Sequence, residues 1–379
     1  MIPRLDRLLI ALCSFAIVAA ACSQDSPSMV PASPEPATTT SDSPIDSIDP
    51  GWTRVDLGAP PNVSLTGAYA GPQGLVITAG VYGATGSEGF TWTSADARTW
   101  TFSTTPGPMA PSIGASIGDL EVMVGAGETS RCAHPFGETT WARRAGGPWL
   151  AAPFQILFCA GGAPQLAAGG GRFVVAGSGT GDQPFAWWSV DGLVWHDVPP
   201  PADPFPLVRG LTWDGGMFWM VARGESDVLV RTSLDGVSWT SWSILAGTAR
   251  ADPIALLPLD GRPILVTGGA RANVSRLVVN GGAPVALDRN PLGEDPEWGL
   301  GFASTSGRLY LNLRTAAGPL LMTSRDGTRW DIVDLPPLKG FFVAGLADDG
   351  TNLLIVGGVE DPVGSTTGSS WIGTSPSSR

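Results

Sequence analysis

The chain has 379 residues and a formal net charge of −12, with 22 Lys and Arg against 34 Asp and Glu. Only 15% of the residues are charged and 43% are hydrophobic, a composition that excludes a disordered or collagen-like chain. The acidic balance argues against a surface for nucleic acid or anionic lipid, because neither binds an unneutralised negative partner.

The first 21 residues are predicted to be an export signal. Arg4 and Arg7 supply a positive start, and the apolar run from Leu8 to Ala21 is too short for a comfortable membrane span. The run ends in Ala-Ala-Ala-Cys22, which resembles the lipobox of bacterial lipoproteins. This resemblance implies that Cys22 carries lipid and that this anchor alone holds the exported chain at the outer face of the cell membrane or in the periplasm. Cleavage after Ala21 without lipid is the alternative.

Residues 22–50 are predicted to be a disordered tether, because Ser, Pro, Thr and Asp dominate them and leave little to bury. The folded domain is predicted to span residues 51–379. No segment of that domain is apolar for the roughly 18 residues that a second membrane span requires.

A short motif recurs through this domain. Four copies share the pattern Ser-x-Asp-Gly-x-x-Trp and begin at Ser94, Ser189, Ser233 and Ser324, with Ala97 in place of Gly in the first. Their spacings of 95, 44 and 91 residues indicate a unit of about 45 residues, of which two copies are degenerate. We place these two at 140–149 and 278–285, and the two halves of a seventh copy at the ends of the domain.

Each unit holds four short apolar strands, which we letter A to D, and no segment shows a helical period. Seven second strands can be counted, from 75–80 to 353–358. Four-stranded units at this period predict an all-β fold, a seven-bladed β-propeller of antiparallel blades. The strand after Trp52 is predicted to serve as strand D of the seventh blade, so that it closes the ring with the C-terminal blade.

The motif resembles the Asp-box, or BNR repeat, of sialidases, sortilin-type receptors and photosystem assembly-factor propellers, here one residue shorter than usual. We expect each Asp to accept backbone N–H groups of the C-to-D turn, Gly to supply a positive φ, and Trp to pack between neighbouring sheets. Recurrence in four blades favours this structural role over catalysis or metal binding. Kelch repeats are the nearest alternative. The structural residues so predicted are Ser94, Asp96, Trp100, Ser189, Asp191, Gly192, Trp195, Ser233, Asp235, Gly236, Trp239, Ser324, Asp326, Gly327 and Trp330.

Strand alternation predicts two faces for the ring. The C-to-D and A-to-B turns lie on one, which we call the box face, and the B-to-C loops and D-to-A connections lie on the other, the loop face. Ligands of propellers usually bind on the loop face, around the central channel. Cys132 and Cys159 both fall there, in a loop and a connection of the second blade, and we predict a disulfide between them.

The residues favour a binding module over an enzyme. Because His134 and His196 are the only histidines, a His-rich metal centre is excluded, and we expect no metal, no cofactor and no catalytic residues. The Asp-box resemblance raises one alternative, a glycan-binding module or a sialidase-like glycoside hydrolase. That family requires an Arg triad, a Tyr–Glu pair and an acidic Asp, whereas Tyr310 is expected near the box face, away from such a site.

Candidate ligand-binding residues lie where A strands begin at the loop face and in the loops beside them. Aromatic and acidic side chains gathered there could grip a protein or a glycan, while packing between blades and solvation are the plainer roles. The candidates are Arg209, Glu294, Asp295, Glu297, Trp298, Lys339, Phe341, Phe342, Glu360 and Asp361.

Together these features predict a lipid-anchored, monomeric propeller outside the cytoplasm that binds an envelope or secreted protein and no nucleic acid. A glycan ligand is the first alternative. An assembly factor for a membrane complex is the second, and it rests on the photosystem resemblance alone.

Overall fold

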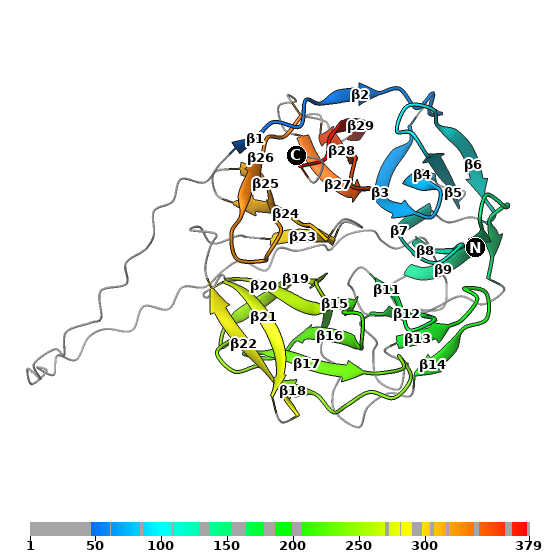
Figure 1. The fold of residues 1–379 in the computed structure, drawn as a ribbon. Helices are drawn as coiled ribbons and strands as arrows, with labels where there is room; N and C mark the ends of the chain where they lie inside the picture. Colours follow the sequence, from blue (N-terminus) through cyan, green and yellow to red (C-terminus); the bar gives the residue numbers. More distant parts are fainter. Residues whose placement is uncertain are drawn as a thin grey trace, which may run out of the picture. The chain divides into compact units, whose positions relative to one another are not determined.

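Seven β-sheets stand in a ring around a central axis (Figure 1). The computed structural model describes residues 47–60, 62–83, 86–107, 110–128, 136–152, 164–177, 186–198, 207–269, 273–280, 282–289, 298–303, 307–315, 318–336, 341–360 and 366–376. Within these ranges the regular structure consists of strands, with no α-helix. The predicted seven-bladed, all-β propeller is confirmed. The predicted signal, lipidation site and most of the tether lie outside the described residues.

The first four blades follow one another in chain order, each with strand A innermost. Blade one holds β3 (Ser64–Gly71), β4 (Gly74–Gly83), β5 (Gly86–Ser94) and β6 (Thr101–Thr105). Blade two holds β7 (Ala110–Ile117), β8 (Leu120–Glu128), β9 (Phe136–Arg144) and β10 (Leu150–Ala151). Blade three holds β11 (Gln165–Gly169), β12 (Arg172–Ala176), β13 (Ala186–Ser189) and β14 (His196–Val198). Blade four holds β15 (Leu207–Trp213), β16 (Phe218–Arg223), β17 (Val228–Ser233) and β18 (Ser243–Ile244).

The last three blades complete the ring and include the N-terminal strands. Blade five holds β19 (Ala251–Leu259), β20 (Arg262–Gly269), β21 (Asn273–Asn280) and β22 (Ala283–Arg289). Blade six holds β23 (Trp298–Ala303), β24 (Leu309–Thr315), β25 (Gly318–Ser324), β26 (Asp331–Val333) and, as a fifth strand, β1 (Ser47–Ile48). Blade seven holds β27 (Phe341–Asp348), β28 (Asn352–Glu360), β29 (Thr366–Thr374) and β2 (Thr53–Val55).

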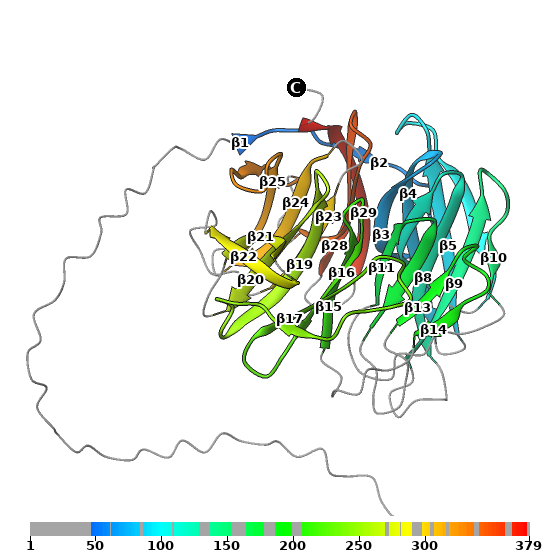
Figure 2. The same cartoon turned by 60° about the horizontal axis from the view of Figure 1, so that its bottom comes forward.

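The N-terminal strands bind two blades. As predicted, β2 is strand D of blade seven: it runs antiparallel to β29, with Thr53 opposite Ile372 and Val55 opposite Ser370. The strand β1 was not predicted, and it adds in parallel to the outer edge of β26 (Figure 1). Figure 2 shows β1 in blue near β25 of the same blade. Between these strands, the indole of Trp52 donates a hydrogen bond of 2.6 Å to the carbonyl of Asp334, which lies just after β26.

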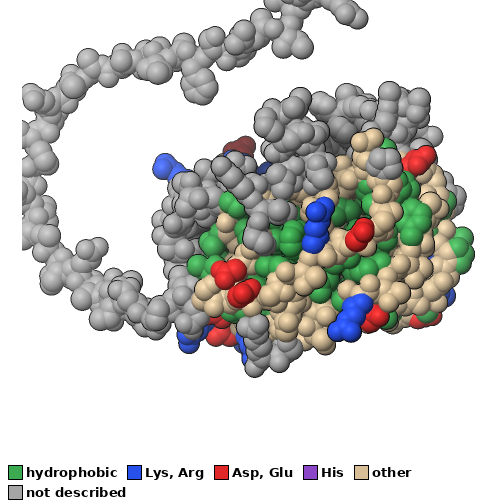
Figure 3. Space-filling view, turned by 90° about the horizontal axis from the view of Figure 1, so that it is seen from above, with side chains coloured by type: hydrophobic (Ala, Val, Ile, Leu, Met, Phe, Trp, Pro, Cys, Tyr) green, Lys and Arg blue, Asp and Glu red, His purple; other side chains and the backbone are tan. Residues whose placement is uncertain are grey.

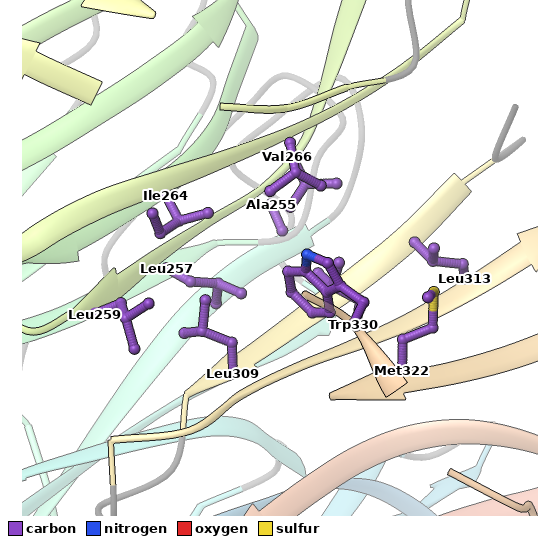
Figure 4. Packing of buried hydrophobic residues seen from close by; sticks show 11 residues of the cluster. Ala255, Leu257, Leu259, Ile264, Val266, Leu309, Leu313, Met322 and Trp330 are labelled. Carbon is purple, nitrogen blue, oxygen red and sulfur yellow. The ribbon is translucent and has the colours of Figure 1, made fainter. Parts of the chain in front are cut away.

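Each hydrophobic core lies between two adjacent sheets rather than within one. The cluster in Figure 4 combines Leu257 and Ile264 of blade five with Leu309 and Met322 of blade six, and the indole of Trp330 packs among them. Trp330 is 3% exposed. The Trp residues of the other three motif copies belong to equivalent clusters between blades. These Trp side chains therefore join neighbouring blades.

The four motif turns share one hydrogen-bonding pattern. In blade four, Ser233 donates its hydroxyl to Asp235, which accepts the backbone N–H groups of Val237 and Ser238 at 2.9 and 2.8 Å. Gly236 has a φ of 71°, and the same position in blade one is Ala97 with a φ of 58°. An L residue with a side chain rarely adopts this left-handed conformation, so the turn imposes it on Ala97.

These bonds hold the motif carboxylates in the charged form. Hydrogen bonds from the backbone N–H groups of Thr99 and Arg98 lower the pKa of Asp96 from its ordinary value of 3.8 to about 2. Partial burial acts to raise the pKa of the equivalent Asp191, Asp235 and Asp326, but the same kind of bonds outweighs it, so each pKa is lowered.

Replacing Trp330 with Ala should strongly destabilise the ring, because it removes the largest side chain of one interblade core. We expect the free energy of unfolding to fall by about 3–5 kcal/mol. The matched control is Leu234→Ala, at a motif position where the side chain is 73% exposed, and it should cost less than about 0.5 kcal/mol. Urea titrations followed by circular dichroism compare the two. Equal effects would contradict the packing role of Trp330.

Low pH should remove the contribution that the motif carboxylates make to the stability of the fold. A carboxyl group with a lower pKa in the folded chain stabilises the fold above its unfolded pKa, and this contribution is lost as the pH falls through the folded pKa. Asp96→Asn should therefore lower the urea midpoint of unfolding near neutral pH. The difference in midpoint between this variant and the native protein should disappear as the pH falls from about 4 to about 2. Glu225→Gln, at an exposed loop carboxyl, is the control. A difference in urea midpoint that does not change with pH would contradict a stabilising role for the charged form of Asp96.

Candidate ligand-binding face

The inner A strands share an irregularity near the loop face. In five of them the register shifts by one residue a short distance after the strand begins, which is a β-bulge. Bulges turn a side chain in a new direction and are common beside binding sites. The bulged residues are Thr66, Ser112, Arg209, Ile254 and Ala344.

Close backbone contact holds this part of the ring together. A Cβ atom on Gly67 would lie 2.1 Å from the carbonyl oxygen of Ser112 in blade two, and one on Gly345 would lie 2.3 Å from the backbone nitrogen of Ala68 in blade one. The glycines that follow the bulges in blades one and seven therefore let three A strands approach more closely than side chains would allow.

The A strands enclose a central channel with a volume of about 590 Å³. Its described lining comes from blades one to five and blade seven and is mostly Gly, Ala, Ser, Thr and Leu. Asp348 is the one carboxylate among these lining residues, and it is 1% exposed. Its carboxylate accepts a hydrogen bond of 2.6 Å from the hydroxyl of Tyr310 in blade six.

The box face holds two buried pairs of a tyrosine and a carboxylate, and both join neighbouring blades. Tyr69 of blade one donates its hydroxyl to Glu121 of blade two at 3.0 Å, and Arg143 forms an ion pair with the same carboxylate, also at 3.0 Å. Burial, followed by the charge of Glu121, raises the pKa of Tyr69 well above its ordinary value. Burial and the charge of Asp348 likewise raise the pKa of Tyr310. Both phenols are therefore held in the protonated form near neutral pH.

Arginines also gather on the box face. Arg308, Arg325 and Arg329 line a pocket of about 320 Å³ beside the motif turn of blade six. Arg308 and Arg325 both donate to the carbonyl of Pro376, at 3.3 and 3.1 Å. These arginines therefore lie on the face opposite the loop face, and the sialidase-like alternative would need them on the loop face.

The structure places some of the predicted ligand-binding residues at the loop face. Arg209 is exposed on the bulge of β15, and Phe342 is half-buried at the start of β27. Phe341 is 2% exposed and packs in the core between blades six and seven. It is a packing residue, and its assignment to the binding surface is corrected.

The other candidates are described in part or not at all. Trp298 is the first residue of β23, and Glu360 is the last residue of β28 rather than part of the loop that follows it. The remaining predicted residues, together with the predicted disulfide, lie outside the described residues: Glu294, Asp295, Glu297, Lys339 and Asp361, and Cys132 with Cys159.

A cleft of about 480 Å³ lies where the ring closes, between blades seven and one. The connection from β2 to β3 forms one wall, and Gly368, Ser369 and Ser370 of β29 form the other. Two charged residues, Arg54 and Asp56, are exposed on the lining. The space-filling view in Figure 3 shows few charged side chains among apolar and uncharged groups on this side of the ring. Sequence reasoning missed this cleft because no motif marks it.

Two features are absent from the described residues. No three or more His, Cys, Asp or Glu side chains in them are grouped so as to hold a metal ion. The described part of the chain also has no helix of the length and apolarity needed to cross a membrane.

No protein-family model matches this sequence, and comparison with curated proteins finds no match. Solved structures do resemble the fold. A GH93 α-L-arabinofuranosidase of Fusarium graminearum, in complex with arabinobiose, is 13% identical with a TM-score of 0.50, over 83% of this chain and 95% of that one. A prolyl endopeptidase is 15% identical with a TM-score of 0.55, over 81% and 46% of the two chains. An acylaminoacyl peptidase of Pyrococcus horikoshii is 8% identical with a TM-score of 0.49, over 82% and 52%.

The chain therefore spans about half the length of either peptidase and nearly all of the arabinofuranosidase. At these identities the likeness is one of fold, and catalytic residues cannot be carried over by it. The described chain is a seven-bladed β-propeller with structural neighbours among glycoside hydrolases and peptidases.

Proposed function

We propose that this protein is a non-catalytic binding module that takes an envelope or secreted protein on its loop face, and that a lipid on Cys22 anchors it outside the cytoplasm. The anchor rests on the sequence before residue 47. The binding role rests on the chemistry of two cavities, the central channel and the cleft at the closure of the ring.

The carboxylates of these cavities carry the proposal. A glycoside hydrolase of the usual kind needs two carboxyl groups on either side of one scissile bond. The described lining of the channel offers Asp348, which is buried and bonded to Tyr310. The lining of the cleft offers Asp56, which accepts the backbone N–H of Gly58 at 3.0 Å. One carboxylate in the described lining of each cavity suits binding better than hydrolysis.

A glycan ligand is the second candidate, favoured by the fold shared with the arabinofuranosidase over most of both chains. The Tyr69, Glu121 and Arg143 set has the residue types of a sialidase centre, but it is buried on the box face. A glycan would therefore be bound at the loop face without that set.

Capture of a partner by the tagged full chain from solubilised envelopes tests the protein-binding role. Arg209→Glu reverses a charge on the exposed bulge of β15 near the loop face, and we expect recovery of the partner to fall by about tenfold or more. Arg262→Glu makes the same change on the box face, at the start of β20, and should leave recovery unchanged. Equal recovery with both variants would contradict binding at the loop face.

The glycan alternative predicts a different result. Incubation with arabinobiose and with a glycan array should give neither released sugar nor binding if the ligand is a protein. Sugar released by the native chain, or a glycan bound by it, would replace the protein-binding proposal with the carbohydrate one.

A further inference from the structure

The outer edge of blade seven is only partly covered. The strand β29 has nine residues, from Thr366 to Thr374. Its outer neighbour β2 pairs with three of them, Ser370, Trp371 and Ile372. No described strand pairs with the outer edge from Thr366 to Ser369. At about 3.3 Å per residue, these four residues present some 13 Å of strand edge.

The sequence after β2 explains why that strand stops early. Asp56 accepts the backbone N–H of Gly58 through its side chain, and Gly58 adopts a φ of 56°, so the chain turns away from β29. Leu57 then packs against the core between blades seven and one, and its carbonyl accepts a hydrogen bond of 3.0 Å from the indole of Trp92 in blade one. The turn is therefore held by the next blade and cannot slide back to cover the edge.

The turn and the uncovered edge form the walls of the cleft at the closure of the ring. Leu57, Val63 and Leu65 supply apolar surface to the cleft, while Gly368 and Ser369 stand on the strand side. Proteins usually protect an open edge with Lys, Pro or an inward charge. The sequence Thr-Thr-Gly-Ser-Ser of residues 366–370 has none of these.

We infer that this cleft binds an extended polypeptide segment, which pairs its backbone with residues 366–369 of β29 and continues the line of β2. The edge presents backbone N–H and C=O groups, and the backbone of a polypeptide supplies the matching hydrogen-bond acceptors and donors. The apolar surface suits a segment with an apolar residue at alternate positions, because alternate side chains of a strand share one face. This inference rests on the proposed function and names the partner's binding element.

The same kind of addition already occurs on the neighbouring blade. There Ser47 and Ile48 of the N-terminal segment pair with Ile332 and Val333 as a fifth strand on the outer edge of β26. A short segment of two residues thus remains in place on such an edge. The free edge of β29 is about twice as long, so it can accept more backbone bonds.

Phage-displayed random heptapeptides, selected on the full chain, supply the probe. Enriched peptides are synthesised with a fluorophore, and their affinities are measured by anisotropy. Ala59→Trp fills the cleft from an exposed lining position, and we expect it to weaken binding by about tenfold or more. Ala246→Trp makes the same change in an exposed connection between blades four and five and should have no effect.

Methylation of single peptide amides tests the pairing itself. Only alternate amides of an added strand face the partner strand, so methyl groups at alternate positions should weaken binding by about tenfold and the others should have little effect. Insensitivity to methylation, binding that survives Ala59→Trp, or no enriched peptide would each overturn the inference. A partner captured equally by the native chain and by Ala59→Trp would overturn strand addition while leaving the binding module intact.

Discussion

The ring depends on one short stretch of backbone pairing. Blade seven lacks a strand D of its own, and Thr53, Arg54 and Val55 from the other end of the chain provide it. Because each hydrophobic core lies between two blades, an unclosed seventh blade would expose the cores on both of its sides. The closure is reinforced beside the strand, where Thr374 donates its backbone N–H to the carbonyl of Pro50 at 2.8 Å.

The fold could be predicted from the sequence because repeated units reveal themselves by their spacing. Four motif copies fixed the period, and the unmatched halves near Trp52 and Trp371 predicted the closure. The strand β1 could not be predicted, since Ser47 and Ile48 lie in a segment without a strand pattern. The bulges also escaped prediction, because an extra residue so near the start of a strand changes the alternation of only the two or three residues before it.

The candidate site was harder to predict than the fold. Phe341 was assigned to the surface because an A strand begins there, but a strand end can face the core or the solvent, and the neighbouring blade decides which. The buried Tyr69–Glu121 and Tyr310–Asp348 pairs join residues that are 52 and 38 positions apart, and no local pattern connects them. The cleft arises from a turn that Trp92 of another strand holds in place.

The recurrent bulge accepts different side chains without a change in the geometry of the ring. Backbone register is restored within one residue of the irregularity in five blades, although the bulged residues are as different as Thr66, Ser112, Arg209, Ile254 and Ala344. Their chemistry can therefore change one blade at a time while the strands that carry them stay in place. Propellers of this design can acquire new specificities by substitution at the rim, without insertions and without loss of the scaffold.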